Sequence, residues 1–284
     1  VETDGHSGDA GTKTRMEAFL YCVDTDLRSR ASTATERKDM VRLAKQNASL
    51  RQARDRGAVV LIPRMGPNAE VVAATLRGEG IRAESLPLST RDDVRTGRKH
   101  TSGKECVPMM LTLGALLNRI ERDRNTDQEF VYMMPTAGGP CRFGVYNTLH
   151  KITLEQTGWG DRVRVFSPDD GDYFRDTSPQ FSLRTWVAFC AQDLLQMMLH
   201  DVRPVERRKG AANEIYERST RELIAAMERP SKGSLARGFG ELVTGMWGAR
   251  DILKRAAKQF AEVKCATREV PTVSVVGEIY VRLD

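Results

Sequence analysis

Short apolar runs alternate with helically spaced apolar residues through the middle of the chain. Five consecutive apolar residues, Ala58–Ile62, lie between a glycine and a proline, which is typical of a short strand buried on both faces of a parallel sheet. The next segment, NAEVVAATLRGEG, has helical spacing, with Asn68 as the predicted N-cap and Gly78 or Gly80 as the predicted end. IRAESLPL then alternates like a second strand, so the unit is strand, helix, strand.

The same alternation continues downstream. A helix is predicted from VPMMLTLGALLNRI through about Arg124, and EFVYMMP (129–135) is predicted to be a strand. VYNTLHKITLEQTG predicts a helix that ends at Gly158, and RVRVFSP (162–168) predicts a further strand. Alternating strands and helices indicate the α/β class, here a Rossmann-like three-layer domain with a parallel sheet over residues 57–168.

The flanking segments have different patterns. Residues 1–56 are predicted to be a linker, 1–15, followed by N-terminal helices that end at Gly57. Residues 169–268 carry long stretches with helical spacing and form a predicted helical segment. Residues 269–284 contain a predicted strand, Thr272–Val276, which we expect to begin a second α/β lobe, so that the chain reads as an internal fragment of a longer polypeptide.

Composition narrows the function classes. The chain has 284 residues, 40% hydrophobic and 29% charged, enough for a sizeable core or two domains. No run of about 18 apolar residues occurs, so we expect no membrane-spanning helix. The net charge of +6 comes from scattered basic residues mixed with 38 acids, and only 6% of residues are aromatic, which argues against a nucleic-acid interface. Five widely spaced cysteines argue against a secreted disulfide framework and favour the reducing cytoplasm.

Two of the cysteines occur in similar surroundings. In SGKECVP and AGGPCRFG a loop of small residues leads to a cysteine, Cys106 or Cys141, that opens a predicted helix. Since strand-loop-helix connections of a parallel sheet share the carboxyl edge, both cysteines are predicted to point into one crevice. Unpaired amides and the helix dipole at a helix start stabilise a thiolate and can also bond to the sulfides of an iron–sulfur cluster.

The small residues of these loops extend the hypothesis. Gly103, Gly138 and Gly139 would let the backbone approach a cluster closely, so a soft metal centre bound by thiolates is predicted. The alternative is that each cysteine is a small buried hydrophobe. That structural interpretation is favoured for Cys22 and Cys265.

The structural interpretation is also favoured for Cys190, which shares a helical face with Trp186 and Leu194. The histidines form no metal-binding pattern: His150 is interpreted as a helix-surface residue, and His100 is of interest only because it lies close to Cys106 in sequence.

No sequence of a phosphate-binding loop is present. In GEIYVR, Glu278 follows a glycine at the end of the last predicted strand. It is interpreted either as lying near the crevice or as part of a structural turn.

Taken together, GRKHTSGKECVPMMLTLG, MPTAGGPCRFGVYNTL and VVGEIYVR resemble the 2-hydroxyacyl-CoA dehydratase-like superfamily. The similarity is greatest to the fused proteins called CoA-substrate-specific enzyme activases, and it covers about residues 57–284. The resemblance implies a bilobed α/β fold with an iron–sulfur cluster held by cysteines between the lobes. It makes Cys106 and Cys141 two of the ligands, leaves a 4Fe–4S and a double-cubane cluster as alternatives, and places a further cysteine in the second lobe.

The resemblance also implies partners and an activity. An ATP-binding activase domain or subunit would deliver a low-potential electron under anaerobic conditions, a CoA thioester would be the substrate class, and similar lobes would pair as a dimer. The predicted function is therefore an iron–sulfur electron-transfer module of an ATP-dependent 2-hydroxyacyl-CoA dehydratase-like system; whether this chain is itself an enzyme stays open. The alternatives are a cluster-free docking or regulatory domain of the activase, and a redox switch in which the two cysteines form a disulfide.

Overall fold

The computed structural model describes most of the chain after residue 45. The described residues are 46–277 without 103–104, 138–140, 169–176, 231–234, 266–269, 272 and 275, together with the helical residues Lys13, Met16, Glu17, Phe19, Leu20 and Val23. Contacts divide the chain into two compact units, residues 1–45 and residues 46–284. The second unit contains the sheet, the helices that cover its two faces and the helices that follow the sheet in the chain.

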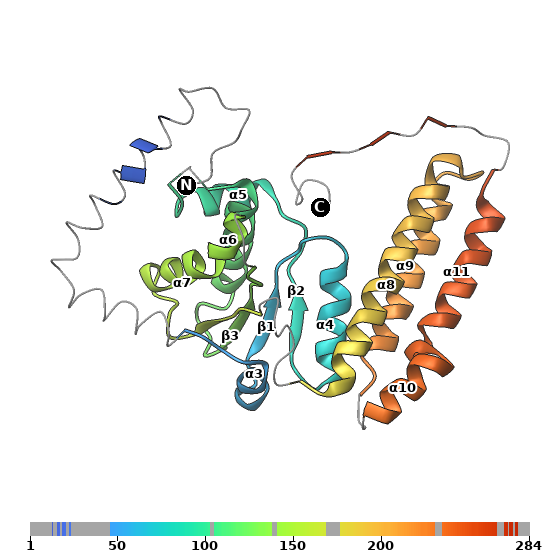
Figure 1. Cartoon of the computed structure of the whole chain (residues 1–284), viewed down its shortest axis with the longest axis horizontal. Coiled ribbons are helices and arrows are strands. Elements are labelled where there is room, and N and C mark those ends of the chain that lie inside the picture. The colour runs from blue at the N-terminus through green and yellow to red at the C-terminus, as the bar shows by residue number, and fades with distance from the viewer. Residues whose placement is uncertain are drawn as a thin grey trace. The chain divides into compact units, whose positions relative to one another are not determined.

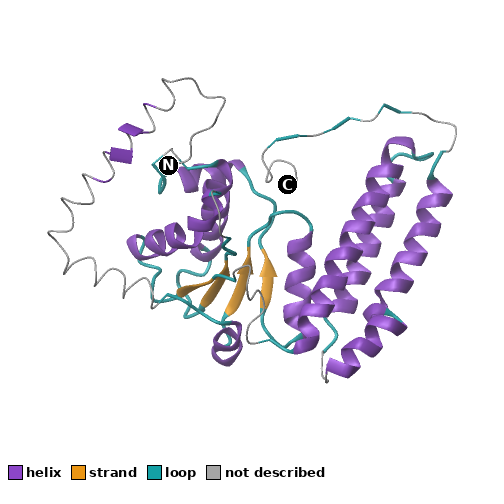
Figure 2. Ribbon diagram, viewed as in Figure 1, coloured by secondary structure: helices purple, strands orange, loops and turns teal. Residues whose placement is uncertain are grey.

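Four parallel strands form the sheet in the order β2-β1-β3-β4 (Figure 2). The strands are β1 (Val59–Ile62), β2 (Ala83–Ser85), β3 (Phe130–Met133) and β4 (Val163–Phe166). Each falls inside a predicted strand. The α/β class and the parallel sheet are therefore confirmed.

Helices cover both faces of the sheet. Side chains alternate along each strand, so that Val59 and Leu61 enter one core while Val60 and Ile62 enter the other. The first core is closed by α6 (Val107–Glu121) and α7 (Tyr146–Gln156), and the second by α3 (Leu50–Arg56) and α4 (Asn68–Gly78). This arrangement is the predicted three-layer, Rossmann-like fold.

A short polar helix, α5 (Arg91–Arg98), was not predicted from the sequence. Its start is a capping box, in which the Thr90 hydroxyl accepts from the Asp93 amide at 3.3 Å and the Asp93 carboxylate accepts from the Thr90 amide at 2.7 Å. Helix α5 packs directly on α6: a Cβ on Gly97 would lie 2.0 Å from a backbone oxygen of α6, and one on Gly114 would lie 1.8 Å from a backbone oxygen of α5. The two backbones touch because both contact positions are glycine.

The helices after the sheet share a core of their own. They are α8 (Pro179–Val202), α9 (Ala211–Met227), α10 (Leu235–Thr244) and α11 (Ala249–Val263). Val71 and Ala74 of α4 belong to the same core, so this helical group packs on the outer face of α4 (Figure 1). None of the helices within the described residues is both long and apolar enough to cross a membrane.

The predicted N-terminal helix is wrong just before α3. Asn47 pairs with Val165 in an isolated parallel bridge, and the Ala48 amide donates to the Val165 carbonyl oxygen at 3.1 Å. The open edge of β4 thus takes the backbone bonds of this segment, and the helix begins only at Leu50, after the Ser49 cap. The predicted end is confirmed, because Gly57 closes α3 with φ of 65°.

Two further predictions fail locally. Asn68 is the first residue of α4 and Pro67 takes the N-cap position, because the Asn68 side chain bonds to Asp193 of α8 instead. Val273 and Val276 of the predicted last strand lie in no strand and are 79% and 85% exposed, while Thr272 and Val275 lie outside the described residues. A strand needs a neighbour for its backbone hydrogen bonds, and the described residues supply none at this segment.

Candidate functional site

Cys106 and Cys141 both occupy N-cap positions. Cys106 precedes α6 with φ of −72° and ψ of 154°, and Cys141 precedes the 3₁₀ turn η2 (Arg142–Val145) with φ of −69° and ψ of 129°. Turn η2 leads directly into α7. Each carbonyl starts its helix: the Met109 amide donates to the Cys106 oxygen at 3.0 Å, and the Gly144 amide donates to the Cys141 oxygen at 3.2 Å. Each cysteine therefore opens a helix, as its loop sequence predicts.

The two helix starts border a common cavity of about 120 Å³. Its lining comes from the start of α6 and from the η2–α7 segment: Glu105, Cys106, Met109, Arg142, Val145, Tyr146 and Leu149. Cys106 is partly buried at this cavity, and Cys141, directly before Arg142, is exposed. The starts of α6 and of the η2–α7 segment thus meet at one cavity, which Cys106 lines and Cys141 does not.

Tyr146 connects the two helix starts. Its side chain is 4% exposed, and its hydroxyl is hydrogen-bonded to the Cys106 Sγ. The Phe143 ring meets the Tyr146 ring edge-on, with centroids 5.2 Å apart. Because a thiolate sulfur offers only acceptor sites, the Tyr146 hydroxyl would donate to Cys106 in its charged form. This bond positions the Cys106 sulfur at the start of α6.

His150 lies one turn further along α7 and is fully buried. Its Nδ1 donates to the Tyr146 carbonyl oxygen at 2.5 Å, its Nε2 has no partner among the described residues, and its ring lies 5.1 Å from that of Tyr132. Burial lowers the pKa of His150 to about 4, so the imidazole is neutral at pH 7. The interpretation of His150 as a helix-surface residue is wrong, because this face of α7 packs onto the sheet.

Several residues singled out in the sequence lie outside the described residues: Gly103, Gly138, Gly139, Glu278 and Cys22. The predicted roles of the three glycines and Glu278 beside a cluster, and the structural interpretation of Cys22, stay predictions. His100 is exposed at the end of α5. Within the described parts of the chain, no group of three or more His, Cys, Asp or Glu side chains is arranged to hold a metal ion.

The remaining described cysteines lie elsewhere. Cys190 is exposed on α8, beside Trp186, which is 70% exposed, and Leu194, which is 45% exposed. The interpretation of Cys190 as core filler is therefore wrong, because this apolar face of α8 is turned outward and lines a separate cavity. Cys265 is partly buried after α11, and its amide donates to the Val205 oxygen at 2.8 Å. None of the four described cysteines forms a disulfide bond within the described part of the chain.

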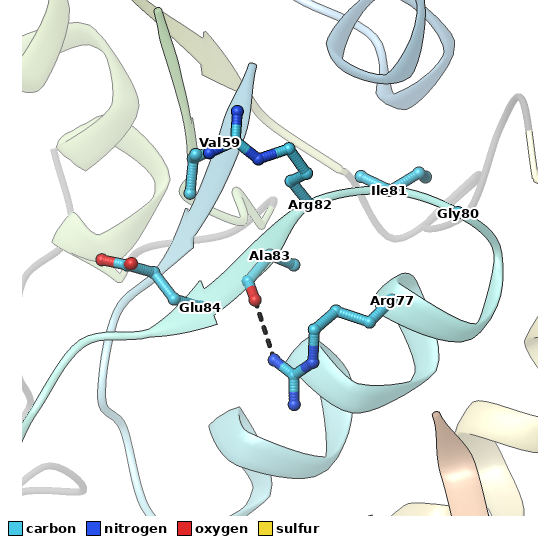
Figure 3. A pocket seen from close by; sticks show the side chains of 7 residues that line it. All are labelled: Val59, Arg77, Gly80, Ile81, Arg82, Ala83 and Glu84. Carbon is cyan, nitrogen blue, oxygen red and sulfur yellow. Dashed lines mark hydrogen bonds between the residues drawn. The ribbon is translucent and has the colours of Figure 1, made fainter. Parts of the chain in front are cut away.

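A larger hollow of about 400 Å³ lies at the opposite end of the strands, beside Val59 and Ala83, the first residues of β1 and β2 (Figure 3). Its arginines already have structural partners. The Arg77 guanidinium donates to the Ala83 oxygen at 2.8 Å and pairs with Glu228 (the Arg77–Ala83 bond is drawn in Figure 3), and Arg82 donates to the Gly57 oxygen at 2.9 Å. The Arg77 contact pairs a backbone oxygen of the edge strand β2, and the Arg82 contact ties the residue before β2 to Gly57 at the end of α3. We therefore assign this hollow to fold stability and not to chemistry.

Comparison with known proteins gives one distant similarity. A stretch of 108 residues, 38% of this chain, is 27% identical to the HTH-type transcriptional regulator BetI of Proteus mirabilis (strain HI4320). The match covers 51% of that regulator, so this chain spans about half the length of the curated relative. No protein-family profile matches the chain, and no solved structure matches it.

Proposed function

We propose that this chain is the iron–sulfur electron-transfer module of an ATP-dependent system similar to the 2-hydroxyacyl-CoA dehydratases, with Cys106 and Cys141 as two cluster ligands. The observation that supports this proposal is the placement of the two thiols. Both are N-caps, and their helix starts border one cavity. Thiolates at helix starts, with amide hydrogens nearby, are the ligand type that iron–sulfur clusters use.

A four-iron cluster takes about four thiolate ligands, and the proposal draws two of them from the described residues. Cys106 lines the cavity, and Cys141 directly precedes Arg142, which also lines it. The other ligands would come from residues outside the described ones or from another lobe or chain, as the resemblance to the dehydratase-like superfamily implies. The cluster could be of the 4Fe–4S or the double-cubane type.

The chain's own residues would bind and tune the cluster. Cys106 is held by Tyr146, and the exposed Cys141 would place one side of the cluster near the protein surface, where an electron donor can approach. When bound, the cluster supplies one-electron transfer at a potential set by its ligands, its hydrogen bonds and its exposure to solvent. The loop amides of Gly103, Gly138 and Gly139 and the carboxylate of Glu278 belong to the same proposal.

The proposal includes a setting for this electron transfer. An ATP-binding activase domain or subunit would deliver the electron, a CoA thioester would be the final acceptor, and pairing of similar lobes would give a dimer. The wide spacing of the five cysteines along the chain supports a reducing cytoplasm as the compartment that we propose for the protein.

A redox titration of the full-length protein tests this function. The protein would be reconstituted anaerobically with ferrous iron and sulfide, and the reduced cluster followed by electron paramagnetic resonance. Iron–sulfur potentials span roughly −700 to +450 mV, and an electron delivered with ATP hydrolysis calls for a midpoint at or below about −400 mV. A midpoint well above this value would rule out an ATP-driven module. A stable apo-protein that binds no cluster would favour the docking domain, and a disulfide between Cys106 and Cys141 would favour the redox switch.

A further inference from the structure

The cavity that Cys190 lines lies at the point where the strand order reverses. The chain leaves β1 for β2 on one side of it and returns to β3 on the other side. The cavity measures about 490 Å³ and is lined by residues at the carboxyl ends of β1 and β3 and by residues of α4 and α8. Its lining is Ile62, Pro63, Met65, Asn68, Ala69, Val72, Met133, Pro135, Trp186, Phe189, Cys190 and Asp193. In open parallel sheets ligands bind at this position, and the volume is that of a small-molecule pocket.

The walls of this cavity are apolar and partly aromatic. Met65 and Met133 approach from the sheet side, and Trp186 and Phe189 approach from α8. Trp186 is 70% exposed although it is a large apolar side chain. An exposed indole beside a half-buried phenyl ring offers stacking surface to an apolar or aromatic ligand body.

The cavity has two neighbouring polar side chains, Asn68 and Asp193, which are hydrogen-bonded to each other. The Asn68 Nδ2 donates to the Asp193 Oδ1 at 2.9 Å. Because a carboxylate only accepts, this bond fixes the orientation of the Asn68 amide. The Asn68 Oδ1 is then left buried, without a hydrogen-bond partner among the described residues. Because this oxygen is closed off from the cavity space, it offers no contact to a ligand, and the Asp193 carboxylate is the acceptor that a ligand can reach.

The charges around the cavity indicate the charge of its ligand. Asp193 is the only charged side chain among the described lining residues, so an anionic ligand would find no counter-charge. The start of α4 supplies no compensation, because the Ala69 and Glu70 amides already donate to Gly66 and Pro67 at 3.5 and 3.3 Å. The nearby Arg64 is paired with Glu70.

We infer that this cavity binds a small aryl-alkyl amine, whose apolar body lies against Trp186 and Phe189 and whose ammonium group donates to the Asp193 carboxylate. An ammonium group carries several N–H donors and a positive charge, and it can also interact with the face of the indole ring. The inference does not depend on the iron–sulfur proposal, because none of the lining residues is a proposed cluster ligand.

Calorimetric titration of the full-length protein with matched probes tests the inference. The probes are 2-phenylethylamine and tryptamine, each compared with the carboxylate of similar shape, 3-phenylpropanoate or indole-3-propanoate. We expect at least one amine to bind, and its carboxylate to bind at least about tenfold more weakly. Equal or tighter binding of the carboxylates, or no binding of either amine up to about 5 mM, would overturn the inference.

Variants of the lining residues test whether the amine binds in this cavity. Asp193→Asn keeps the shape and removes the charge, and it should weaken amine binding about tenfold without affecting the carboxylates in the same way. Trp186→Ala should weaken the binding of both amines by a similar factor. The matched control is Asp201→Asn, an exposed aspartate on the same helix that pairs with Lys264 outside this cavity. Amine affinity that is unchanged in Asp193→Asn, or reduced equally in Asp201→Asn, would contradict the proposed site.

Discussion

The Cys106 thiol and the Tyr146 hydroxyl form a hydrogen bond across 40 positions of sequence. The bond joins the N-cap residue of α6 to the first residue of α7, which directly follows η2, the turn that Cys141 caps. It links the buried core, in which the Tyr146 ring lies, to a sulfur that is only partly buried. Tyr146 is therefore the residue through which the fold positions the candidate cluster ligand.

Replacing Tyr146 by Phe should make Cys106 less reactive. The variant keeps the ring and removes the donor that would stabilise the thiolate, so alkylation of the apo-protein by iodoacetamide at fixed pH should slow by about three- to tenfold at this position. Peptide mass mapping separates Cys106 from Cys141, whose rate should stay the same. Tyr216→Phe on α9, which removes a hydroxyl that accepts from Gln192 at 2.8 Å, is the matched control. An unchanged or faster rate at Cys106 would show that the bond does not support the thiolate.

His150 should make the fold sensitive to acid. Burial lowers its pKa from 6.5 to about 4, so the unfolded state binds more protons than the folded state between these values, and stability falls as the pH drops through this window. The full effect of about 2.5 pH units corresponds to about 3 kcal/mol of unfolding free energy at pH 4. Urea unfolding at pH 7, 6 and 5 measures the slope.

A variant isolates the histidine from the other titrating groups. His150→Gln should flatten the fall in stability between pH 7 and 5, even if the variant is less stable at pH 7. His200→Gln, at an exposed position of α8, should keep the wild-type slope. If the His150→Gln protein loses stability with acid as steeply as the wild type, the neutral buried histidine is not the cause.

The contact between α5 and α6 should not tolerate a methyl group. Gly97→Ala and Gly114→Ala each place a Cβ within about 2 Å of a backbone oxygen, so each should lower the unfolding free energy by at least about 2 kcal/mol. Gly240→Ala, in an exposed position of α10 with open space around it, should instead stabilise by about 0.5–1 kcal/mol. Denaturant unfolding of the three variants checks the ranking. Mild effects for Gly97 and Gly114 would mean that the helices can separate at little cost.

The sequence predicts the sheet well because each strand buried in a parallel sheet has a short run of apolar residues between turn residues. The run at Ala58–Ile62 gives β1 with little ambiguity. The sequence does not predict α5, because that helix has no apolar stripe. It is stabilised by a capping box and by a close backbone contact at Gly97. Such contacts depend on a glycine in a distant helix, Gly114, and no local pattern reveals them.

The site is predicted in part. Small-residue loops before Cys106 and Cys141 point to two helix starts at one edge of the sheet, and both helix starts form. His150 is misinterpreted although a signal exists: it lies four residues after Tyr146 and four before Leu154, on the buried face of α7. The bond between Tyr146 and Cys106, and that between Asn68 and Asp193, join distant segments and emerge only from the fold.

The most direct test of the central claim is the iron and acid-labile sulfide content of the anaerobically purified full-length protein and its cysteine variants. We expect iron and sulfide in equal amounts in the wild type and in Cys190→Ala, whose exposed thiol lies in the separate cavity. We expect both to be lost in Cys106→Ala and in Cys141→Ala. Iron and sulfide retained at the wild-type level in these two variants would contradict the assignment of Cys106 and Cys141 as cluster ligands.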